Sequence, residues 1–463
     1  MTSTQHIKKV KFAIIGAGSA GLTAWNEIKQ VTDDYVLIDS GPLGTTCARV
    51  GCMPSKALIH IAEHYHSWHE AASLGIEMPA QPILHSDQVF ERVRRFRDRF
   101  TSGLIANTTD TLTEQHFITG RAVVFSNGEV HVNDLVIVAE RLIVAVGSKP
   151  IVPDDWLENL GDLALTSDTV FELDALPNRL AVIGLGVIGL ELGQAFAQLG
   201  VEVEGFDAQA QIGGLQDPIC NDFMQEYVAQ DMPIHLNQQV VPLREQNQVK
   251  ITFSDGEWVG DKILLTLGRR PNNDWRSESL QDLNIDPQTL QLGDLPIFVA
   301  GDASGFHGIL HEANREGKTA AQNAINYPET RGRCNLTPLA IVFSHPQLCR
   351  LGVAFSDLDL SATIIGTFDL NCNNGRAIVM DQDYGRIRLY ADKQSGRLLG
   401  GELAMPSAEH LGHLLAWSVQ MQLTLNELSN MPFYHPVLEE AVQNVIDTML
   451  DEFNAVHGLA KNK

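Results

Sequence analysis

The chain has few cysteines and few cationic residues, and each shortage excludes a class of protein. Six cysteines in 463 residues, with one closely spaced pair, do not make the dense disulfide framework of a small secreted domain. We therefore expect a cytoplasmic protein, in which a disulfide is usually catalytic. The 33 lysines and arginines are outnumbered by 57 acidic residues, and the formal charge of −24 disfavours binding to nucleic acid and to anionic membrane surfaces.

Long apolar runs are also missing. The most apolar stretch, residues 180–199, contains Glu191, Gln194 and several glycines, so it does not resemble a membrane span. At about 150 residues per domain, the length fits three domains with separate cores. We expect a soluble, modular α/β protein with small-molecule or protein partners.

The closely spaced pair is Cys47 and Cys52, in the run TTCARVGCMPSK. Five residues of ideal helix separate two Cα atoms by roughly 8–9 Å, which exceeds the usual disulfide span of about 4.4–6.8 Å. A bridge therefore requires an irregular turn, which Gly51 permits and Pro54 favours by removing a helical donor. Such a strained bridge is more readily reduced than a structural one. Two buried thiols, or half of a metal site, are also compatible with the spacing.

Residues 11–39 and 179–207 have the same pattern of strand, glycine turn, helix and second strand ending in an acid. An offset of 168 residues relates every key position of the two units. The glycines and terminal acids are Gly16, Gly18, Gly21 and Asp39 in the first unit, and Gly184, Gly186, Gly189 and Asp207 in the second.

This pattern is typical of dinucleotide binding. The first glycine makes the turn, the second admits the pyrophosphate and the third lets the helix pack on the strand. The acid is placed to accept from a ribose 2′-hydroxyl, and Asp207 is followed by Ala208 and Gln209, with no arginine for a 2′-phosphate. The second unit therefore favours NAD over NADP. A simpler interpretation of both acids is turn formation after a strand.

Cys47 lies eight residues beyond Asp39, so the thiols are delivered toward the reactive ring of the first cofactor, and a redox enzyme is the leading hypothesis. Residues 141–150, 262–272 and the segment PIFVAGD, which ends at Asp302, read as buried strands ending at glycine. After residue 334 the pattern changes to alternating strands and two amphipathic helices, which predicts an α+β domain. A helix over 408–421 places Leu411, Leu414, Leu415 and Val419 on one side, as core or subunit interface.

The C-terminal run FYHPVLEEAVQNVIDTML predicts a helix that starts near Pro436. His435 then lies at the start of the helix and Glu440 in an early turn, where a carboxylate can orient the imidazole and raise its basicity. This is the base half of a catalytic triad. Alternatively, Glu439 and Glu440 only favour a helix N-terminus and His435 is a polar cap.

Two dinucleotide units, the CxxxxC pair, the AGD segment, a distinct C-terminal domain and a terminal HPxxxE together resemble the flavoprotein pyridine nucleotide-disulfide oxidoreductases. The resemblance covers essentially the whole chain and is greatest to the dihydrolipoamide dehydrogenases. It implies an obligate homodimer with two Rossmann-like domains and a C-terminal α+β domain. The implied division is an FAD domain at 1–150 completed by 276–334, an NAD domain at 151–275 and a dimerisation domain at 335–463.

The resemblance also assigns roles. Besides the glycine units, it implies FAD contacts by Asp39, Thr46, Gly147 and Asp302 and by the start of the helix around His311, and NAD contacts by Asp207 and Gly268. Cys47 exchanges with the substrate and Cys52 passes electrons to the flavin. Lys56 and Glu191 form an ion pair beside the flavin. His435, oriented by Glu440, serves as base at the thiols of the other subunit.

The implied reaction is oxidation of dihydrolipoamide, free or on a lipoyl-bearing protein, with reduction of NAD⁺ through a redox-active Cys47–Cys52 disulfide and without a metal. A reductase of another disulfide driven by NAD(P)H, or a redox-responsive flavoprotein without catalysis, are the alternatives. Three departures from the family pattern leave the substrate open: Thr45 replaces a glycine, Val146 a threonine and Val187 an aromatic residue. Four cysteines have no assigned role: Cys220, Cys334, Cys349 and Cys372.

Overall fold

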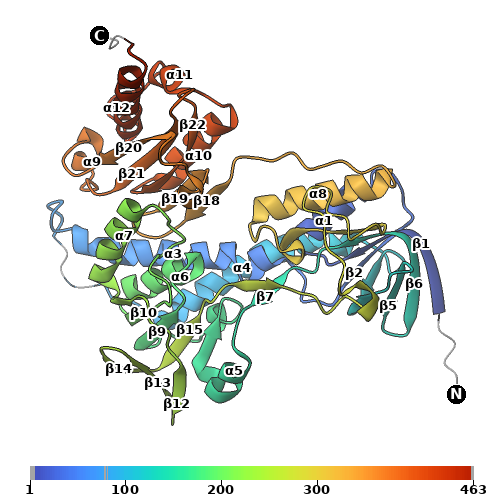
Figure 1. Cartoon of the computed structure of the whole chain (residues 1–463). Helices are drawn as coiled ribbons and strands as arrows, with labels where there is room; N and C mark the ends of the chain where they lie inside the picture. Colours follow the sequence, from blue (N-terminus) through green and yellow to red (C-terminus); the bar gives the residue numbers. More distant parts are fainter. Residues whose placement is uncertain (1–5, 78–79, 81, 460–463) are drawn as a thin grey trace.

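The computed structural model describes residues 6–77, 80 and 82–459, which form three lobes joined by a long helical hairpin (Figure 1). Each lobe is built around its own sheet. Two of the sheets are Rossmann-like and the third belongs to a C-terminal α+β domain, so the predicted fold class is confirmed. The division of the chain at residues 150, 275 and 334 stays a prediction.

The first lobe has a seven-stranded sheet in the order β3-β2-β1-β6-β5-β4, with β17 paired to β6. β1, β2, β3, β6 and β17 run parallel, so β17 completes the sheet only after the chain has built the second lobe. Helices α1 and α8 cover one face, where Phe12 and Ile14 pack. The bounds are β1 His6–Ile15, α1 Ser19–Ile28, β2 Tyr35–Asp39, β3 Phe117–Thr119, β4 Ala122–Val124, β5 Glu129–Val132, β6 Leu135–Val144, β17 Ile297–Val299 and α8 Leu310–Asn326.

The second lobe has a five-stranded parallel sheet in the order β11-β10-β9-β15-β8 and a three-stranded antiparallel sheet β12-β13-β14. The short antiparallel pair β7 and β16 connects the first two lobes. The bounds are β7 Ser148–Pro150, α5 Asp154–Leu160, β8 Ala164–Thr166, β9 Arg179–Ile183, α6 Val187–Gln198, β10 Glu202–Phe206, α7 Pro218–Asp231, β11 Ile234–His235, β12 Pro242–Glu245, β13 Gln248–Phe253, β14 Gly256–Gly260, β15 Lys262–Leu265 and β16 Arg269–Pro271.

The C-terminal lobe has an antiparallel sheet in the order β18-β19-β22-β21-β20. α10 and α12 pack on the sheet, and α7 of the second lobe contacts β21 and β22. The bounds are β18 Leu339–Val342, β19 Leu348–Gly352, β20 Thr363–Asp369, α9 Gly375–Val379, β21 Arg386–Asp392, β22 Leu398–Ala404, α10 Ala408–Gln420, α11 Leu425–Ser429 and α12 Glu440–Val456.

The predicted apolar side of α10 divides between two environments. Leu411 and Leu415 are buried in the domain core, whereas Leu414 is 47% exposed. Trp417 of the same helix and Met421 just after it are also exposed, at 63% and 71%. A helix in a sheet domain buries one stripe, and these three side chains form a second, exposed apolar stripe.

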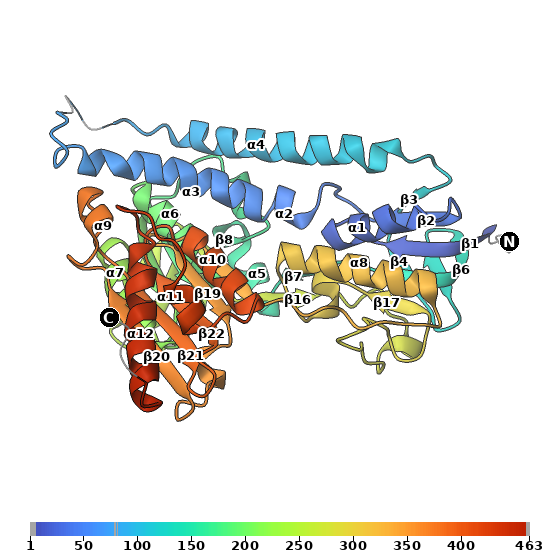
Figure 2. The ribbon, with the colours of Figure 1, turned by 90° about the horizontal axis from the view of Figure 1, so that it is seen from above.

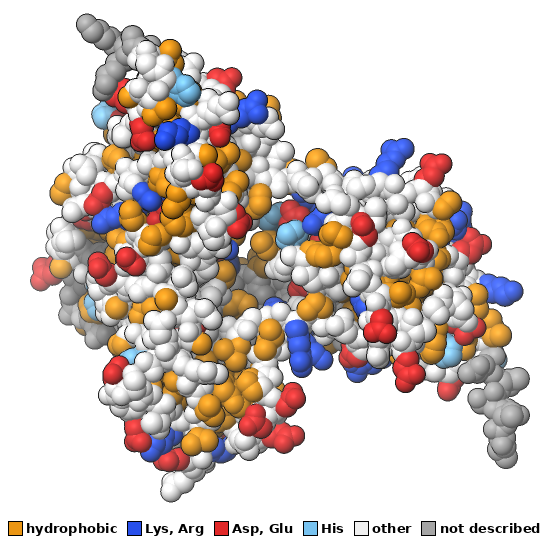
Figure 3. All heavy atoms as spheres, viewed as in Figure 1, with side chains coloured by type: hydrophobic (Ala, Val, Ile, Leu, Met, Phe, Trp, Pro, Cys, Tyr) orange, Lys and Arg blue, Asp and Glu red, His pale blue; other side chains and the backbone are white. Residues whose placement is uncertain are grey.

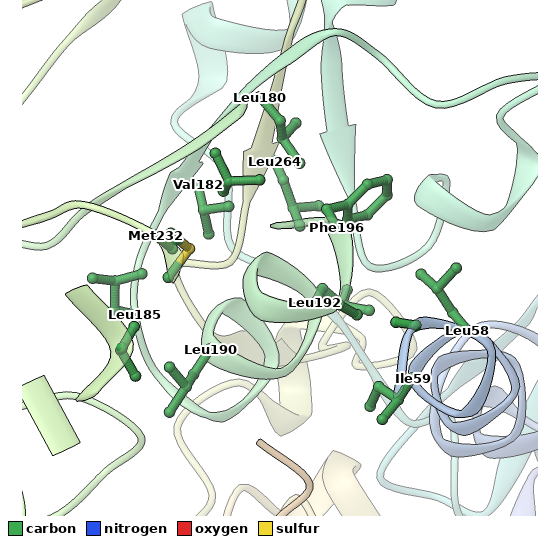
Figure 4. Close-up of a cluster of buried hydrophobic side chains, with 14 of the residues drawn as sticks. Leu58, Ile59, Leu180, Val182, Leu185, Leu190, Leu192, Phe196, Met232 and Leu264 are labelled. Carbon is green, nitrogen blue, oxygen red and sulfur yellow. The ribbon is translucent and has the colours of Figure 1, made fainter. Parts of the chain in front are cut away.

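A hairpin of α3 (Cys52–His66) and α4 (Ser86–Asn107) runs from the first lobe along the second (Figure 2). Leu58 and Ile59 of α3 belong to the same buried cluster as Leu190, Leu192 and other residues of the second lobe (Figure 4). Apolar burial of this kind contributes about 25 cal/mol per Å². The cysteine-bearing helix is therefore fixed against the second dinucleotide unit.

Among the residues that the structure describes, we find no helix with both the length and the apolar character needed to cross a membrane. Acidic side chains are spread over the face drawn in Figure 3, in keeping with the formal charge of −24.

Candidate active site

The predicted irregular turn lies between the two cysteines. Cys47 belongs to the four-residue helix α2 (Thr46–Arg49), and Cys52 is the first residue of α3. Gly51 between them has φ −120° and ψ −119°, outside the helical region. A Cβ on Gly51 would lie 3.1 Å from the Thr46 carbonyl oxygen and 3.2 Å from the Cys47 Cα. Glycine therefore suits the close approach of the two turns of chain.

The residue before this helix carries backbone strain. Thr45 has φ +64° and ψ 149°, a conformation that glycine adopts far more readily than threonine. Its side chain compensates in part, because Thr45 Oγ1 accepts a hydrogen bond of 3.2 Å from Ala48 N and caps α2. The threonine that departs from the family pattern therefore keeps the glycine-like backbone next to Cys47.

Cys47 and Cys52 are free thiols that hydrogen bond to each other. The hydrogen bond from Cys47 lowers the pKa of Cys52 to about 7, and the positive charge of Lys56 acts in the same direction against burial and Glu191. The same hydrogen bond, together with burial, raises the pKa of Cys47. The pair therefore shares one proton, and Cys52 holds the negative charge near neutral pH. The sequence predicts a bridge, and the structure shows the corresponding dithiol.

The predicted pair of Lys56 and Glu191 forms an ion pair of 2.7 Å. Glu191 is 5% exposed within the apolar helix α6, and the ion pair offsets the cost of burying its charge. Its second oxygen accepts a hydrogen bond of 2.9 Å from Phe343 N, and Lys56 Nζ lies 4.5 Å from the Phe343 ring centroid. All three lobes therefore meet one turn beyond Cys52.

The first glycine unit is shaped for a phosphate-bearing ligand. Gly16 has φ +104°, and a Cβ on Gly21 would lie 1.8 Å from the Gly16 carbonyl oxygen. Gly18 caps α1 without a side-chain hydrogen bond, which leaves the helix N–H groups for a pyrophosphate. Asp39 holds this loop, since its two oxygens accept from Ala17 N and from Gly41 N at 2.6 Å each.

The other residues predicted to contact FAD lie around this unit. Thr46 is the exposed first residue of α2. Gly147 has φ +69°, and Asp302, in the short 3₁₀ helix after β17, accepts a hydrogen bond of 2.6 Å from Ser148 Oγ. His311 is the half-exposed second residue of α8. These placements fit an extended FAD, with a helix start near one end.

The second unit repeats the same geometry. Gly184 has φ +95°, and a Cβ on Gly189 would lie 1.9 Å from the Gly184 carbonyl oxygen. Asp207 accepts from Leu185 N at 2.5 Å and from Gln209 N at 2.8 Å. The hydrogen bond to Gln209 N closes the turn after the strand, as expected if Asp207 only forms a turn. Each carboxylate oxygen still has a lone pair for a ribose hydroxyl.

Gly186 and Gly268 form the open side of this second unit. Nothing lies within 4 Å of a Cβ built on Gly186, which caps α6 without a side-chain bond. Gly268 has φ +98° in the connection between β15 and β16. The open space and the uncapped helix start fit the pyrophosphate of NAD.

A carboxylate orients the imidazole of His435. His435 Nδ1 lies 2.8 Å from Glu440 Oε1, and Val437 N donates to Glu440 Oε2 at 3.1 Å. The hydrogen bond with His435 is the largest cause that lowers the pKa of Glu440. The predicted helix start was wrong, because α12 begins at Glu440 and Pro436 lies in the turn before it. The Glu440 carboxylate holds this turn closed by binding Val437 N.

His435 does not turn toward the thiols of its own chain. Its side chain is 79% exposed on the C-terminal lobe, and its partner there is Glu440. The His435 imidazole is therefore accessible from solvent.

A groove of about 440 Å³ opens at Cys47. Its walls come from α1, from the C-terminal end of α4 and from the start of α8, and polar side chains such as Lys29, Asn107 and Asn314 line it. The sequence did not point to α4 as a wall, because its Arg-rich pattern carries no glycine or cysteine signal. Among the described residues, no group of three or more His, Cys, Asp and Glu side chains is placed to hold a metal ion.

A buried carboxylate behind Asp302 was also missed. Glu316 of α8 is fully buried, and one oxygen accepts from Gly301 N at 2.9 Å and from Ser304 Oγ at 2.8 Å. The other oxygen pairs with Arg333 at 2.8 Å. Glu316 therefore holds the turn that carries Asp302, and burial raises its pKa.

Comparison with known proteins places the chain among flavoprotein reductases. Residues 10–326 match the pyridine nucleotide-disulphide oxidoreductase family, and residues 339–446 match its dimerisation domain. The chain is 29% identical to the dihydrolipoyl dehydrogenase of Pseudomonas aeruginosa, over 95% of this chain and 97% of that protein. It is 27% identical to the mercuric reductase of Acidithiobacillus ferrooxidans, over 96% of this chain and 84% of that protein.

Two solved structures share the fold. The Cu(II) complex of the HOCl-induced flavoprotein disulfide reductase RclA from Escherichia coli superposes with a TM-score of 0.81 at 20% identity, over 95% of this chain and 99% of that one. LpdA from Mycobacterium tuberculosis gives a TM-score of 0.80 at 24% identity, over 95% of this chain and 100% of that one.

Proposed function

Because the chain belongs to the pyridine nucleotide-disulphide oxidoreductase family, it is an enzyme that uses FAD and NAD(H), and we propose that it oxidises dihydrolipoamide with NAD⁺ as final acceptor. The dithiol is free or tethered to a lipoyl-bearing protein. One observation carries the proposal: Cys47 and Cys52 lie on either side of the turn at Gly51, one turn before Lys56, and Cys47 lines an open groove.

The exchange starts from the bridged form of the two cysteines. A substrate thiolate attacks Cys47 Sγ, and the Cys47–Cys52 bond breaks. Cys52 leaves as a thiolate, which the positive charge of Lys56 stabilises. The second substrate thiol then attacks the mixed disulfide, which releases the cyclic disulfide product and leaves Cys47 as a thiol. Two electrons have then entered the pair, and bound FAD supplies the route by which they pass to NAD⁺ as hydride.

One proton of the dithiol ends on Cys47, and the other requires a base outside the pair. His435 is suited to this role, because Glu440 fixes its Nδ1 and leaves Nε2 free to accept. We assign it to the groove of the partner subunit, since it is exposed on its own chain and the chain has the dimerisation domain of the family. The exposed Leu414 and Trp417 of α10, with Met421 just after the helix, are the corresponding subunit surface.

We also propose that the chain divides as predicted, at 1–150, 151–275, 276–334 and 335–463, with the third segment completing the FAD domain. A reducing, cytoplasmic compartment is part of this proposal, because six cysteines with one closely spaced pair do not make a disulfide framework and the pair must cycle.

A second candidate is an NADH-driven reductase of another disulfide. The observation that favours it is Thr45, which replaces the family's glycine next to Cys47. One relative is named a mercuric reductase, so proteins similar to this chain are not all dihydrolipoyl dehydrogenases.

Anaerobic titration of the FAD-loaded homodimer with dihydrolipoamide tests the proposal. We expect long-wavelength absorbance from a thiolate beside oxidised flavin, followed by reduction of NAD⁺. Turnover of dihydrolipoamide with NAD⁺ is compared with NADH-driven turnover of glutathione disulfide and other disulfides. Fast turnover of another disulfide beside negligible lipoamide activity selects the second candidate, and Cys47→Ser must abolish either activity.

A further inference from the structure

An arginine-rich helix forms one wall of the Cys47 groove. α4 contains five arginines and three acidic residues in a chain with a formal charge of −24. Figure 2 shows α4 along the outer edge of the molecule. The basic charge of α4 therefore stands out from an acidic protein.

Two of the five arginines hold α4 to the second lobe. Arg94 donates to the Leu173 carbonyl oxygen at 2.7 Å, and Arg97 pairs with Glu172 and Asp98. These side chains are half-buried and are explained by the fold.

The other three arginines face outward. Arg92, Arg95 and Arg99 are exposed, and their spacing of three and four residues places them on one side of the helix; we name them the α4 stripe. Over residues 6–77, 80 and 82–459, no carboxylate pairs with any of the three. Arg92 lies 4.8 Å from the Phe96 ring, and Phe100 at the end of the stripe is 42% exposed. Arginine beside aromatic rings is a composition typical of protein interfaces.

The helix that carries the α4 stripe ends at the groove that contains Cys47. Leu104 and Asn107 of the same helix, and Thr108 just after it, line the groove, and Asn107 lies two turns, or about 12 Å along the helix axis, beyond Arg99. Lys29 lines the same groove from α1. A macromolecule bound on the stripe therefore has a tethered group within reach of Cys47.

We propose that the α4 stripe docks the acidic face of a carrier protein that bears the dithiol substrate, which rests on the proposed function. The general surface repels an acidic protein, whereas unpaired guanidinium groups beside the groove attract it and orient its tethered dithiol toward Cys47. Guanidinium groups also bind carboxylates in a bidentate manner, which fixes register on the stripe. A free dithiol needs none of these contacts.

The test uses the FAD-loaded enzyme with Arg92→Gln, Arg95→Gln and Arg99→Gln combined. The matched control removes the same charge elsewhere, at exposed positions outside the site: Lys9→Gln, Lys11→Gln and Arg376→Gln. The substrates are free dihydrolipoamide, a dihydrolipoyl carrier domain with acidic residues around its lipoyl-lysine, and the same domain with those residues changed to amides.

We expect the stripe variant to lower kcat/KM for the acidic carrier about tenfold at low salt, through KM, with convergence at high salt. Free dihydrolipoamide, the neutralised carrier and the control variant should show no such loss. Equal loss in both variants reflects net charge only and overturns the proposal, as does no loss at all. A changed oligomeric state of the stripe variant makes the stripe a subunit contact and also overturns it.

Equilibrium binding of the acidic carrier is measured beside turnover. Wild-type enzyme that binds the carrier but oxidises neither dithiol contradicts the proposed function and not the stripe. The docking proposal is contradicted if the wild-type enzyme does not bind the carrier. It is also contradicted if the stripe variant binds the carrier as tightly as the wild type does.

Discussion

The two glycine units share one backbone geometry but are supported by different parts of the molecule. Gly16 and Gly184 have φ values of +104° and +95°. A Cβ on the third glycine of each unit would lie 1.8 or 1.9 Å from the carbonyl oxygen of the first. In both units the terminal acid accepts a hydrogen bond from the N–H that follows the first glycine.

The helices that follow the glycines differ. α1 is closed against α8, where a Cβ on Gly317 would lie 2.2 Å from the Ala20 carbonyl oxygen. α6 instead carries buried polar side chains to other lobes: Glu191 reaches Lys56 and Phe343, and Gln194 hydrogen bonds both backbone groups of His345, at 2.7 and 3.0 Å. The glycine geometry is therefore the same in both units. The helices differ in what they pack against: α1 packs on α8 of its own lobe, whereas α6 contacts Lys56 of the cysteine-bearing helix and the C-terminal lobe.

We expect the largest effect from removing one thiol, because this should stop dithiol oxidation and leave both dinucleotide units intact. Cys52→Ser should abolish dithiol oxidation, because a hydroxyl cannot form the bridge. Electron transfer from NADH to an artificial acceptor needs only the two dinucleotide units and should persist. Cys372→Ser, at an exposed cysteine, is the control. Dithiol turnover by the Cys52 variant would show that the pair is not the redox centre.

The second glycines separate the two units from each other. Gly18 and Gly186 have extended backbones that alanine adopts, and a Cβ would meet no protein atom closer than 3.9 Å. We expect Gly18→Ala to purify with less FAD, and Gly186→Ala to keep FAD but raise KM for NAD⁺ about tenfold, equivalent to about 1.4 kcal/mol. Flavin absorbance and steady-state kinetics measure both. Loss of FAD from Gly186→Ala would mean that the units are not assigned correctly.

Substitution of Glu316 tests the first unit alone, because Glu316 holds the turn that carries Asp302 in the first lobe. Glu316→Gln places an amide NH₂ against Arg333 or Ser304 and leaves the guanidinium without its counter-charge. Breaking a buried pair typically costs about 3–5 kcal/mol, so we expect a lower melting temperature and weaker FAD binding to the apoprotein, with NAD affinity of the flavin-loaded enzyme unchanged. Glu312→Gln on the same helix is the control. An unaltered FAD dissociation constant would limit Glu316 to stability.

Local spacing accounts for what the sequence predicted well. The glycine units, the break between Cys47 and Cys52 and the contact of His435 with Glu440 all depend on residues within a few turns of one another. Their chemistry leaves a fixed pattern, such as glycine where a Cβ has no room. The start of α12 was misplaced, because the Glu440 side chain stabilises the turn before the helix.

Partners distant in sequence account for what was missed. Glu316 reads as one more acid on an exposed helix, and its burial depends on Gly301 and Arg333. Likewise Leu414 reads like Leu415 in the periodicity of α10, yet the sheet covers only Leu415. Pairing of Lys56 with Glu191 was predictable from family resemblance and not from either residue's own neighbourhood.

We expect the smallest effect on the pKa of Cys52, one of the two thiols that follow the first unit and have no counterpart after the second. The hydrogen bond from Cys47 is the largest cause of the lowered Cys52 pKa, so its donor can be kept or removed. Cys47→Ser retains an O–H donor and should leave the Cys52 pKa near its value of about 7. Cys47→Ala removes the donor, which destabilises the thiolate and raises the pKa toward that of an ordinary thiol.

The sign of this shift determines the measurement. At pH 7 about half of Cys52 is thiolate in the Ser variant, and the thiolate fraction rises with pH. If the hydrogen bond is worth one pKa unit, or 1.36 kcal/mol, alkylation by iodoacetamide at pH 7 should be about fivefold slower in the Ala variant, and the two rates should converge above pH 9. Equal pH profiles in the two variants would mean that Lys56, which lies one turn beyond Cys52 and is unchanged in both, holds the thiolate without help from Cys47.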